Sequence, residues 1–423
     1  MKTLLKVLLT ALCFVLVGCS TAIQPSGLQE QSVSLSHEGY TLEKVVILSR
    51  HNIRAPLSGK GSVLDSATPH EWYEWSSEAS ELSLKGGVLE TIMGQYFRKW
   101  LDSEGLISEN TRTADNVRIY ANSKQRTIAT ARYFSAALFP NANVPVEYHF
   151  ETDSMDPVFT PQLLFESEAY GLAVTEQIGE LYSEKIDALA DNYALMSYVI
   201  DSPDPDSFRT DDTVYILQKD AEPGLTGSLK IACQISDALV LQYFEEPDEI
   251  RAGFGKKLSI SQWDALSEIK DVYVDVLYTT PLVSVVVAHP LLMELDKEIK
   301  TESRVFSFLC GHDSNVASVL VALQAKEYEV ENAIEKKTPI GCKLVFSEWS
   351  RDGNLYWSVD LVYQTTEQLR ENTVLDLKNG PAVYHIEFKD METNEDGLYS
   401  DAAFKGRFSD TVARYYDVRN AWL

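Results

Sequence analysis

Basic residues are scarce in this sequence. Its 423 residues include 37 Lys and Arg against 63 Asp and Glu, which gives a formal net charge of −26. A field of this sign repels nucleic acids and anionic membrane surfaces, so nucleic acid is not expected as a partner. If the ligand is itself an anion, a few arginines in a cleft must create the attraction locally.

Cysteine is also rare, with five residues in the chain. Cys13 lies inside an N-terminal apolar run and Cys19 follows that run, which leaves Cys233, Cys310 and Cys342 for the body of the protein. Three cysteines form one disulfide at most, so a fold held by a disulfide framework is excluded. Apolar burial must stabilise the core, and the chain is long enough for two domains or for one domain with a large insertion.

Several signatures of catalytic sites are absent. The sequence has no GxGxxG after its first strand-like run, no GxxxxGK[ST] and no GxSxG, which argues against dinucleotide binding, a P-loop and a serine hydrolase. Its seven histidines are scattered, and neither HExxH nor CxxC occurs. A metal centre is therefore poorly supported, and we expect no cofactor.

The N-terminus holds the one apolar run that approaches the length of a membrane span, "MKTLLKVLLTALCFVLVGCS". We interpret residues 1–18 as an export signal that ends in a lipobox, so that Cys19 is acylated after cleavage; a plain signal peptide with a chance cysteine is the alternative. Residues 19–40 are polar and predict a tether. The body is expected in the bacterial cell envelope, periplasmic or surface-exposed, with membrane contact only through the lipid. Its oligomeric state is left open.

Three segments share one local pattern, an apolar run followed by a polar turn and then a helix. The runs are residues 43–48, 116–122 and 304–311, and helical spacing follows the second and third. This alternation predicts an α/β fold with a mostly parallel central sheet flanked by helices, over residues 41–152 and 279–423. Residues 153–278 show long amphipathic stretches without convincing strands, which predicts an inserted helical cap domain. Residues 343–364 are two alternating runs about an Asp-Gly turn and predict a hairpin.

His51, Arg126 and His312 follow the ends of those three strand-like runs. Ligands of such sheets bind outside the carboxyl ends of the strands, so we expect these residues to share one site. The planar fork of arginine matches phosphate geometry, and a neutral imidazole can attack phosphorus and carry the phosphoryl group covalently. Neighbouring arginines would keep the imidazole neutral by lowering its pKa.

The motif Arg50-His51-x-x-Arg54-x-Pro56 resembles the RHGxRxP signature of the histidine acid phosphatases, in branch 2 of the histidine phosphatase superfamily. Downstream segments are also similar to that family, namely "NSKQRTIATA", "GHDSN", "MDPVFTP", "KTPIGCKLVF" and "VYQTTEQLR". The glucose-1-phosphatase branch of the family is the most similar, and it also has asparagine where other members have glycine after the histidine. Because asparagine tolerates a left-handed backbone, we expect Asn52 to adopt the conformation of that glycine.

The resemblance implies a role for each matching residue. His51 is the expected nucleophile and Asp313 the expected proton donor to the leaving alcohol, which predicts an acidic optimum. The phosphoryl oxygens are expected to bind Arg50, Arg54, Arg126 and His312. Each of these residues taken alone would more often be structural, as a solvated arginine, a helix cap or a hydrogen-bonded histidine.

Glu222 is a candidate specificity residue of the cap. Its position before a predicted helix suits a carboxylate that faces the cleft and disfavours highly phosphorylated ligands, although a solvated loop glutamate fits equally well. Three functions then compete: a phosphomonoesterase acting on sugar phosphates such as glucose 1-phosphate, a phytase or broad-specificity acid phosphatase, and a noncatalytic phosphate-ester-binding lipoprotein. The retention of both His51 and Asp313 counts against the third, because simple binding requires neither a nucleophile nor an acid.

Overall fold

The computed structural model describes residues 34–423 except residues 59–60 and 108–115. The predicted export signal, Cys19 and most of the predicted tether lie outside the described residues. The strands are β1 (Thr41–Arg50), β2 (Val117–Ala121), β3 (Val146–Glu147), β4 (Val214–Ile216), β5 (Gly224–Thr226), β6 (Phe306–Gly311), β7 (Lys343–Arg351), β8 (Asn354–Tyr363), β9 (Ala382–His385) and β10 (Tyr399–Ser400).

Helices make up most of the remaining structure. They are α1 (Val63–Ala67), α2 (Leu84–Ser103), α3 (Gln125–Leu138), α4 (Glu168–Val199), α5 (Ser228–Glu245), α6 (Glu249–Ala252), α7 (Ile260–Val274), α8 (Pro281–Val287), α9 (His289–Lys300), α10 (Asp313–Ala322), α11 (Thr366–Glu371) and α12 (Asp401–Trp422). A short 3₁₀ helix, η1 (Pro205–Ser207), follows α4, and a π-helical turn, η2 (Asp275–Thr279), follows α7.

The central sheet has the strand order β10-β8-β7-β1-β6-β2-β3, with β9 also paired to β8. Strands β1, β6, β2 and β3 run parallel, and the strands on the β7 side are added antiparallel. The predicted α/β fold with a parallel central sheet is therefore confirmed. The predicted hairpin is β7–β8, and its turn places Asp352 and Gly353 at φ 54° and 78°, as a two-residue turn of this kind requires.

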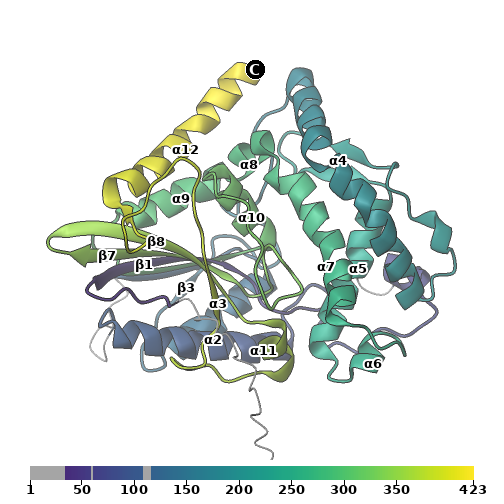
Figure 1. Ribbon diagram of the computed structural model, residues 1–423, viewed down its shortest axis with the longest axis horizontal. Coiled ribbons are helices and arrows are strands. Elements are labelled where there is room, and N and C mark those ends of the chain that lie inside the picture. Colours follow the sequence, from purple (N-terminus) through teal and green to yellow (C-terminus); the bar gives the residue numbers. More distant parts are fainter. Residues whose placement is uncertain (1–33, 59–60, 108–115) are drawn as a thin grey trace, which may run out of the picture. The chain divides into compact units, whose positions relative to one another are not determined.

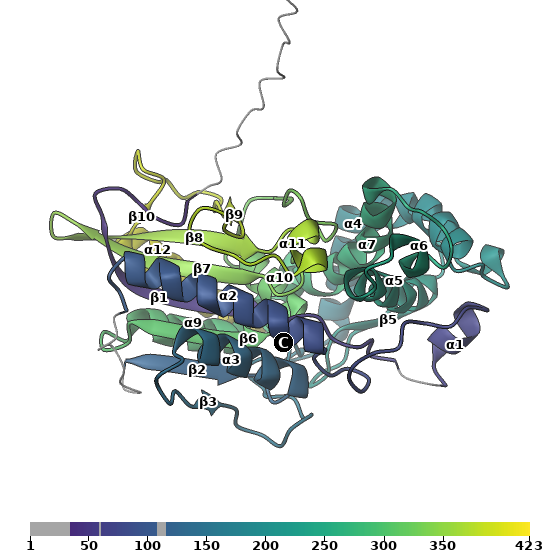
Figure 2. The same ribbon diagram turned by 90° about the horizontal axis from the view of Figure 1, so that it is seen from below.

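Successive apolar side chains of β1 point to opposite faces of the sheet, so the strand contributes to the cores on both faces. Val45 and Ile47 belong to the core beneath α2 and α3, whereas Val46 and Leu48 belong to the core on the opposite face, with residues of α8, α9, α10 and α12. Figure 1 shows the sheet between these two helical layers, and Figure 2 shows α2 and α3 in front of it. Burial on both faces explains why the parallel strands are almost continuously apolar in sequence.

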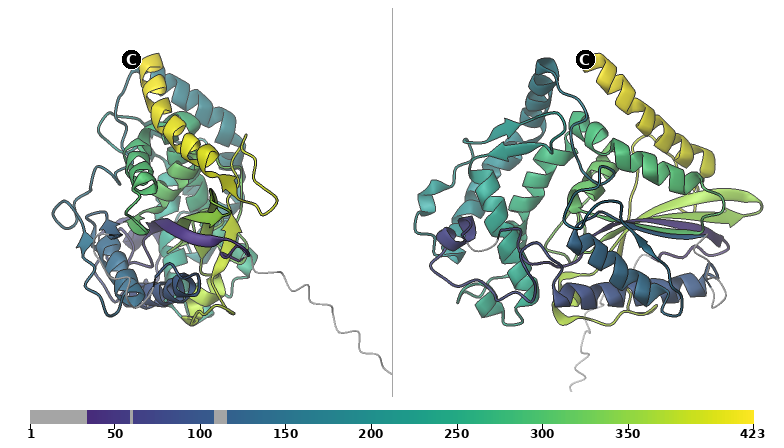
Figure 3. Two further views of the ribbon diagram at one scale, coloured as in Figure 1. Left: turned by 90° about the vertical axis from the view of Figure 1, so that its left-hand side faces the viewer. Right: turned by 180° about the vertical axis from the view of Figure 1, so that it is seen from behind.

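The chain between the third and sixth strands is mainly helical, and α4 to α7 lie beside the sheet (Figure 3). One expectation fails there, because β4 and β5 form a short antiparallel hairpin where no strand was predicted. The apolar cluster on one face of the sheet continues without a break into these helices. The proposed cap boundaries, residues 153–278, stay a prediction.

Cys310 and Cys342 are buried and Cys233 is partly buried, and all three are free thiols. No helix among the described residues combines the length and apolar character needed to cross a membrane.

Strand register brings the ends of β1, β6 and β2 to one place. Arg50 lies opposite Gly311, and Ala121 lies opposite Cys310. The ladder continues one residue further, since the His51 N–H donates to the Gly311 carbonyl at 3.0 Å. The residues that follow the three strands therefore meet at one edge of the sheet, as predicted for a ligand site.

Candidate active site

A cavity of about 490 Å³ opens at this edge, between the strand ends and helices α5 and α7. Six of the predicted site residues line it, namely His51, Arg54, Arg126, Glu222, His312 and Asp313. The N-termini of α3 and α10 adjoin the same cavity, because Arg126 and Asp313 stand in the first turns of these helices. A helix N-terminus favours a bound anion, so both helices make this cavity more favourable for an anionic ligand.

The ring of His51 is held in one tautomer. Its Nδ1 lies 2.9 Å from the carbonyl oxygen of Asn52, which can only accept a hydrogen bond, so Nδ1 carries the proton. Nε2 is left with a free lone pair. Burial, together with the positive charges of Arg126 and Arg54, lowers the pKa of His51 well below its ordinary value. The side chain is thus a neutral imidazole with a nucleophilic nitrogen.

His312 has the same tautomer as His51, and Asn122 determines it. The amide oxygen of Asn122 accepts hydrogen bonds from the backbone N–H groups of Ser123 and Asp156, at 2.8 and 2.9 Å. Its amide nitrogen therefore faces Nε2 of His312, at 2.7 Å, and donates to it. Nδ1 of His312 must carry the proton, and it lies 3.5 Å from Nη2 of Arg126. Two donors side by side form a site for an anionic oxygen.

Arg54 and Arg126 are each oriented by one side-chain partner and keep spare donors, although Nη1 of Arg54 also donates to the Ala55 carbonyl at 3.1 Å. Arg54 Nη2 contacts Asp237 Oδ2 at 2.9 Å, and Arg126 Nη1 donates to Ser80 Oγ at 2.8 Å. The Nε groups of both arginines are buried without a hydrogen-bond partner among the described residues. Burial and the nearby Arg54 lower the pKa of Arg126 to about 10, which leaves its guanidinium charged at neutral pH. A bound phosphoryl group would satisfy these donors.

Arg50 is placed differently from the other cations. Its side chain is 1% exposed and does not line the cavity. One nitrogen, Nη1, pairs with Glu335 at 2.7 Å, and the other, Nη2, lies 3.4 Å from Asp313 Oδ2. The guanidinium therefore holds the carboxylate of Asp313 from behind, and direct contact of Arg50 with phosphoryl oxygens stays a prediction.

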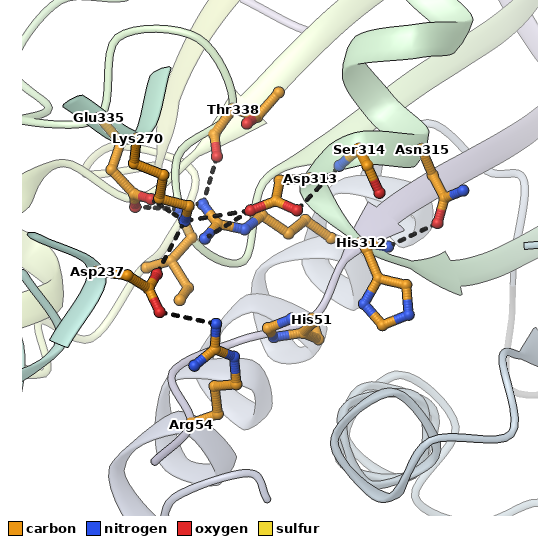
Figure 4. A network of polar contacts seen from close by, with 12 residues as sticks. His51, Arg54, Asp237, Lys270, His312, Asp313, Ser314, Asn315, Glu335 and Thr338 are labelled. Carbon is orange, nitrogen blue, oxygen red and sulfur yellow. Dashed lines mark hydrogen bonds and ion pairs between the residues drawn. The ribbon is translucent and has the colours of Figure 1, made fainter. Parts of the chain in front are cut away.

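Asp313 stands at the first position of α10 and lines the cavity, and its carboxylate lies between Lys270 and the backbone of Ser314 (Figure 4). Oδ1 accepts the backbone N–H of Ser314 at 2.9 Å, and Oδ2 lies 3.1 Å from Nζ of Lys270. Burial alone would raise the pKa of Asp313, but Lys270 and Arg50 outweigh it and hold that pKa well below the usual range. The N-cap of α10 is His312, and its backbone N–H donates to Asn315 Oδ1 at 2.9 Å.

The expectation that Asn52 adopts a left-handed backbone in place of glycine is wrong. Asn52 does not have a positive φ, so it does not replace glycine for backbone reasons. Its side-chain Nδ2 instead donates to Glu90 at 2.9 Å, and Glu90 pairs with Lys343 at 3.0 Å; both charged side chains are 0% exposed. The Asn52 amide also packs against Gly341, whose φ is +71° and where an added Cβ would meet Asn52 Nδ2 at 2.6 Å. A buried polar network therefore supports the loop that carries His51.

Glu222 lines the cavity, but it leads into β5 and not directly into a helix. The hydroxyl of Tyr278 donates to Glu222 Oε2 at 3.3 Å. Glu222 is an exposed residue, but the protein around its carboxylate displaces water and raises its pKa, and this hydrogen bond opposes the rise. Its predicted role in specificity stays a prediction.

Sequence reasoning missed the charged partners of the site, which are Asp237 on α5, Lys270 on α7 and Glu335 in the loop before β7. Each is buried. Charged residues on amphipathic helices are normally solvated, so nothing in the local pattern distinguishes these positions. Among the described residues, no group of three His, Cys, Asp or Glu side chains is arranged to hold a metal ion.

Comparison with known proteins agrees with this geometry. The profile of the histidine phosphatase superfamily (branch 2) matches residues 41–364. The glucose-1-phosphatase of Salmonella typhimurium is 36% identical over 376 residues, which cover 85% of this chain and 90% of that protein. The glucose-1-phosphatase of Providencia rettgeri is 35% identical over 375 residues, with coverage of 85% and 89%.

Solved structures give the same result. The Hafnia alvei phytase in complex with tartrate superimposes with a TM-score of 0.79 at 25% identity, and covers 89% of this chain and 98% of that one. The same phytase in complex with myo-inositol hexakis sulphate has a TM-score of 0.78 at the same identity and coverage. The chain therefore belongs to branch 2 of the histidine phosphatase superfamily and is a phosphomonoester hydrolase.

Proposed function

We propose that this protein hydrolyses sugar phosphomonoesters in two steps, through a phosphohistidine on His51. The observation that carries the proposal is the hydrogen bond from Nδ1 of His51 to the Asn52 carbonyl, which leaves the Nε2 lone pair for attack. In the first step Nε2 bonds to phosphorus, the ester P–O bond breaks, and Asp313 gives its proton to the departing oxygen. In the second step water attacks phosphorus, Asp313 takes a proton from that water, and the P–N bond breaks.

Arginine and histidine donors would stabilise the transferring phosphoryl group. The side chains of Arg54, Arg126 and His312 all line the cavity. Nη2 of Arg126 and Nδ1 of His312, which are both donors, lie 3.5 Å apart with no acceptor between them. Donors held in place before the reaction lower the barrier, because no reorganisation is needed as charge develops on the oxygens.

The protonation of Asp313 sets the pH dependence. Its pKa is held well below the usual range by Lys270 and Arg50, against the effect of burial. A bound phosphate ester adds negative charge beside the carboxylate and raises the pKa toward the working pH. The proton donor is still populated best in acid, so we expect the optimum for sugar phosphates below neutrality.

Glucose 1-phosphate is the substrate that the relatives suggest, since two curated proteins with this activity in their names share 35–36% of their residues with the chain. A net charge of −26 and the Glu222 carboxylate in the cavity lining both disfavour a heavily phosphorylated substrate such as phytate. We therefore expect phytate to be hydrolysed more slowly than glucose 1-phosphate.

The test combines labelling and a substrate panel. Wild type and His51→Ala are mixed with ³²P-labelled glucose 1-phosphate and quenched within milliseconds. The wild type should retain label that is labile in acid and stable in base, as expected for phosphohistidine, and the variant should retain none. Phosphate release is then measured on glucose 1-phosphate, nitrophenyl phosphate and phytate across pH. A variant that keeps a tenth of wild-type turnover would disprove the covalent mechanism, and faster release from phytate would disprove the substrate assignment.

A further inference from the structure

A buried lysine lies at the centre of the charged groups behind the active site. Nζ of Lys270, on α7, lies 3.3 Å from Asp237 Oδ1, 3.1 Å from Asp313 Oδ2 and 3.2 Å from Glu335 Oε1. We call these three carboxylates the carboxylate cluster. They come from α5, α10 and the loop before β7, so one ammonium group joins three separate segments of the chain (Figure 4).

Two members of the carboxylate cluster also orient the arginines of the Arg50-His51-x-x-Arg54 motif. Asp237 uses its other oxygen, Oδ2, to hold Arg54 Nη2 at 2.9 Å. Glu335 Oε1 holds Arg50 Nη1 at 2.7 Å. Lys270 is therefore linked through one carboxylate to each arginine, and it contacts the predicted proton donor directly.

From this geometry we propose that Lys270 is a positioning residue that controls when Asp313 carries a proton. Lys270 is 8% exposed, so solvent screens its charge little. It contacts the same carboxylate oxygen, Oδ2, that Arg50 approaches at 3.4 Å. Oδ1 of Asp313 accepts the Ser314 N–H at 2.9 Å and has a second lone pair for the leaving group or water. The ammonium fixes the orientation of the carboxylate and opposes its protonation until a substrate anion arrives.

Other groups also act on Asp313, from every element packed around it. They are Arg50 and His51 at the end of β1, Arg126 on α3, Glu222 before β5, Cys233 and Asp237 on α5, Tyr273 on α7, Tyr278 in η2, His312 beside it, and Cys342 before β7. Of the cations, Lys270 is the one that lowers the pKa of Asp313 most. The charge of Lys270 is itself secure, because Glu335, Asp313 and Asp237 together raise its pKa despite its burial.

The inference rests on the proposed function, in which Asp313 is the proton donor. Lys270→Gln removes the positive charge beside Oδ2, so the pKa of Asp313 must rise. Loss of an opposite charge at this distance typically moves a carboxyl pKa by about 1–3 units. The protonated donor then persists to higher pH, and the basic limb of the kcat profile for glucose 1-phosphate moves upward by a similar amount. Hydrolysis of nitrophenyl phosphate depends little on general acid catalysis, so the basic limb of its kcat profile should move much less.

Two variants complete the design. Lys230→Gln is the matched control, since Lys230 lines the same cavity from α5 but is exposed and forms no ion pair with the described residues. The basic limb of the kcat profile of this variant should not move. Asp237→Asn keeps Lys270 but removes one of the carboxylates that compete with Asp313 for its ammonium group, so the basic limb of the kcat profile should move to lower pH. This variant provides the test if Lys270→Gln does not fold.

The experiment measures kcat for both substrates from pH 3 to 8 on the full chain, with circular dichroism to verify folding. The phosphohistidine label is quantified in parallel for every protein. An upward shift for Lys270→Gln on glucose 1-phosphate, with none for Lys230→Gln, supports the proposal, as does a downward shift for Asp237→Asn. A folded Lys270→Gln that forms phosphohistidine but shows an unmoved limb overturns it. Absence of label in the wild type would instead refute the proposed function.

Discussion

The buried pair Glu90–Lys343 supports the loop that carries His51, and its removal should be costly. Both side chains are 0% exposed, and Lys343 Nζ lies 3.0 Å from Glu90 Oε1 and 2.6 Å from the Gly341 carbonyl. Lys343→Met leaves the Glu90 carboxylate with one side-chain donor, the Asn52 amide at 2.9 Å. An uncompensated charge in such a position costs about 3–5 kcal/mol, so we expect the free energy of unfolding to fall by that amount.

A double-mutant cycle separates the interaction from the effects of each side chain. Glu90→Leu strands the ammonium of Lys343 and should cost about as much as Lys343→Met. The double variant replaces both charges by apolar groups and should cost far less than the sum, with a coupling energy of at least about 2 kcal/mol. Urea unfolding of the full chain, followed by tryptophan fluorescence, measures all four proteins.

An exposed ion pair provides the control. Lys326 and Glu387 lie 2.6 Å apart, but their side chains are 55% and 64% exposed, so Lys326→Met should change stability little. Additive costs for Glu90→Leu and Lys343→Met would refute the reasoning, because the two charges would then be stabilised independently. A loss in Lys343→Met no larger than that in Lys326→Met would refute it as well.

Three further perturbations have definite expected outcomes. Asp313→Asn should slow phosphohistidine formation from glucose 1-phosphate by roughly 10²–10⁴-fold but affect nitrophenyl phosphate far less, in rapid-quench bursts; equal losses would exclude proton donation. Burial lowers the pKa of His289, stacked on Tyr415, to about 4. The imidazole is therefore protonated at higher pH in the unfolded chain than in the folded one, and the free energy of unfolding falls as the pH drops from about 6.5 to about 4. His289→Phe should remove about 2–3 kcal/mol of that fall, measured by urea unfolding across this pH range. An unchanged pH dependence would contradict the assignment. Because Cys19 is proposed to carry the lipid, Cys19→Ser should abolish palmitate incorporation while the body stays folded, and labelling equal to wild type would disprove the anchor.

Secondary structure with a strong local pattern was predictable. The three buried runs became β1, β2 and β6, and the helical spacing after Ser123 became α3, which begins at Gln125. These segments contain many residues whose periodicity and burial agree, so the pattern is clear. The short strands β3, β4, β5, β9 and β10 have two to four residues each and pair at edges or in a separate hairpin. So few residues cannot show a period, and their pairing depends on neighbours that are distant in sequence.

Site residues divide in the same way. His51, Arg126 and His312 follow strand ends, and strand ends in a parallel sheet share one edge, so their meeting was predictable. The role of the Asn52 side chain could not be predicted, because its hydrogen-bond partner Glu90 lies 38 residues further along the chain. Lys270 lies in an amphipathic helix where any solvated lysine would look the same.

The sequence by itself determined the order of strand and helix in the α/β core, the motif residues at the strand ends and the acidic net charge. These properties follow from adjacent residues, whose spacing and chemistry act locally. The tertiary structure alone decided which nitrogen of each histidine carries the proton, since the Asn52 carbonyl and the Asn122 amide impose that choice through contacts of 2.9 and 2.7 Å. It also decided that Lys270 is desolvated beside Asp313, because burial and the meeting of charges from separate segments exist only after the chain has folded.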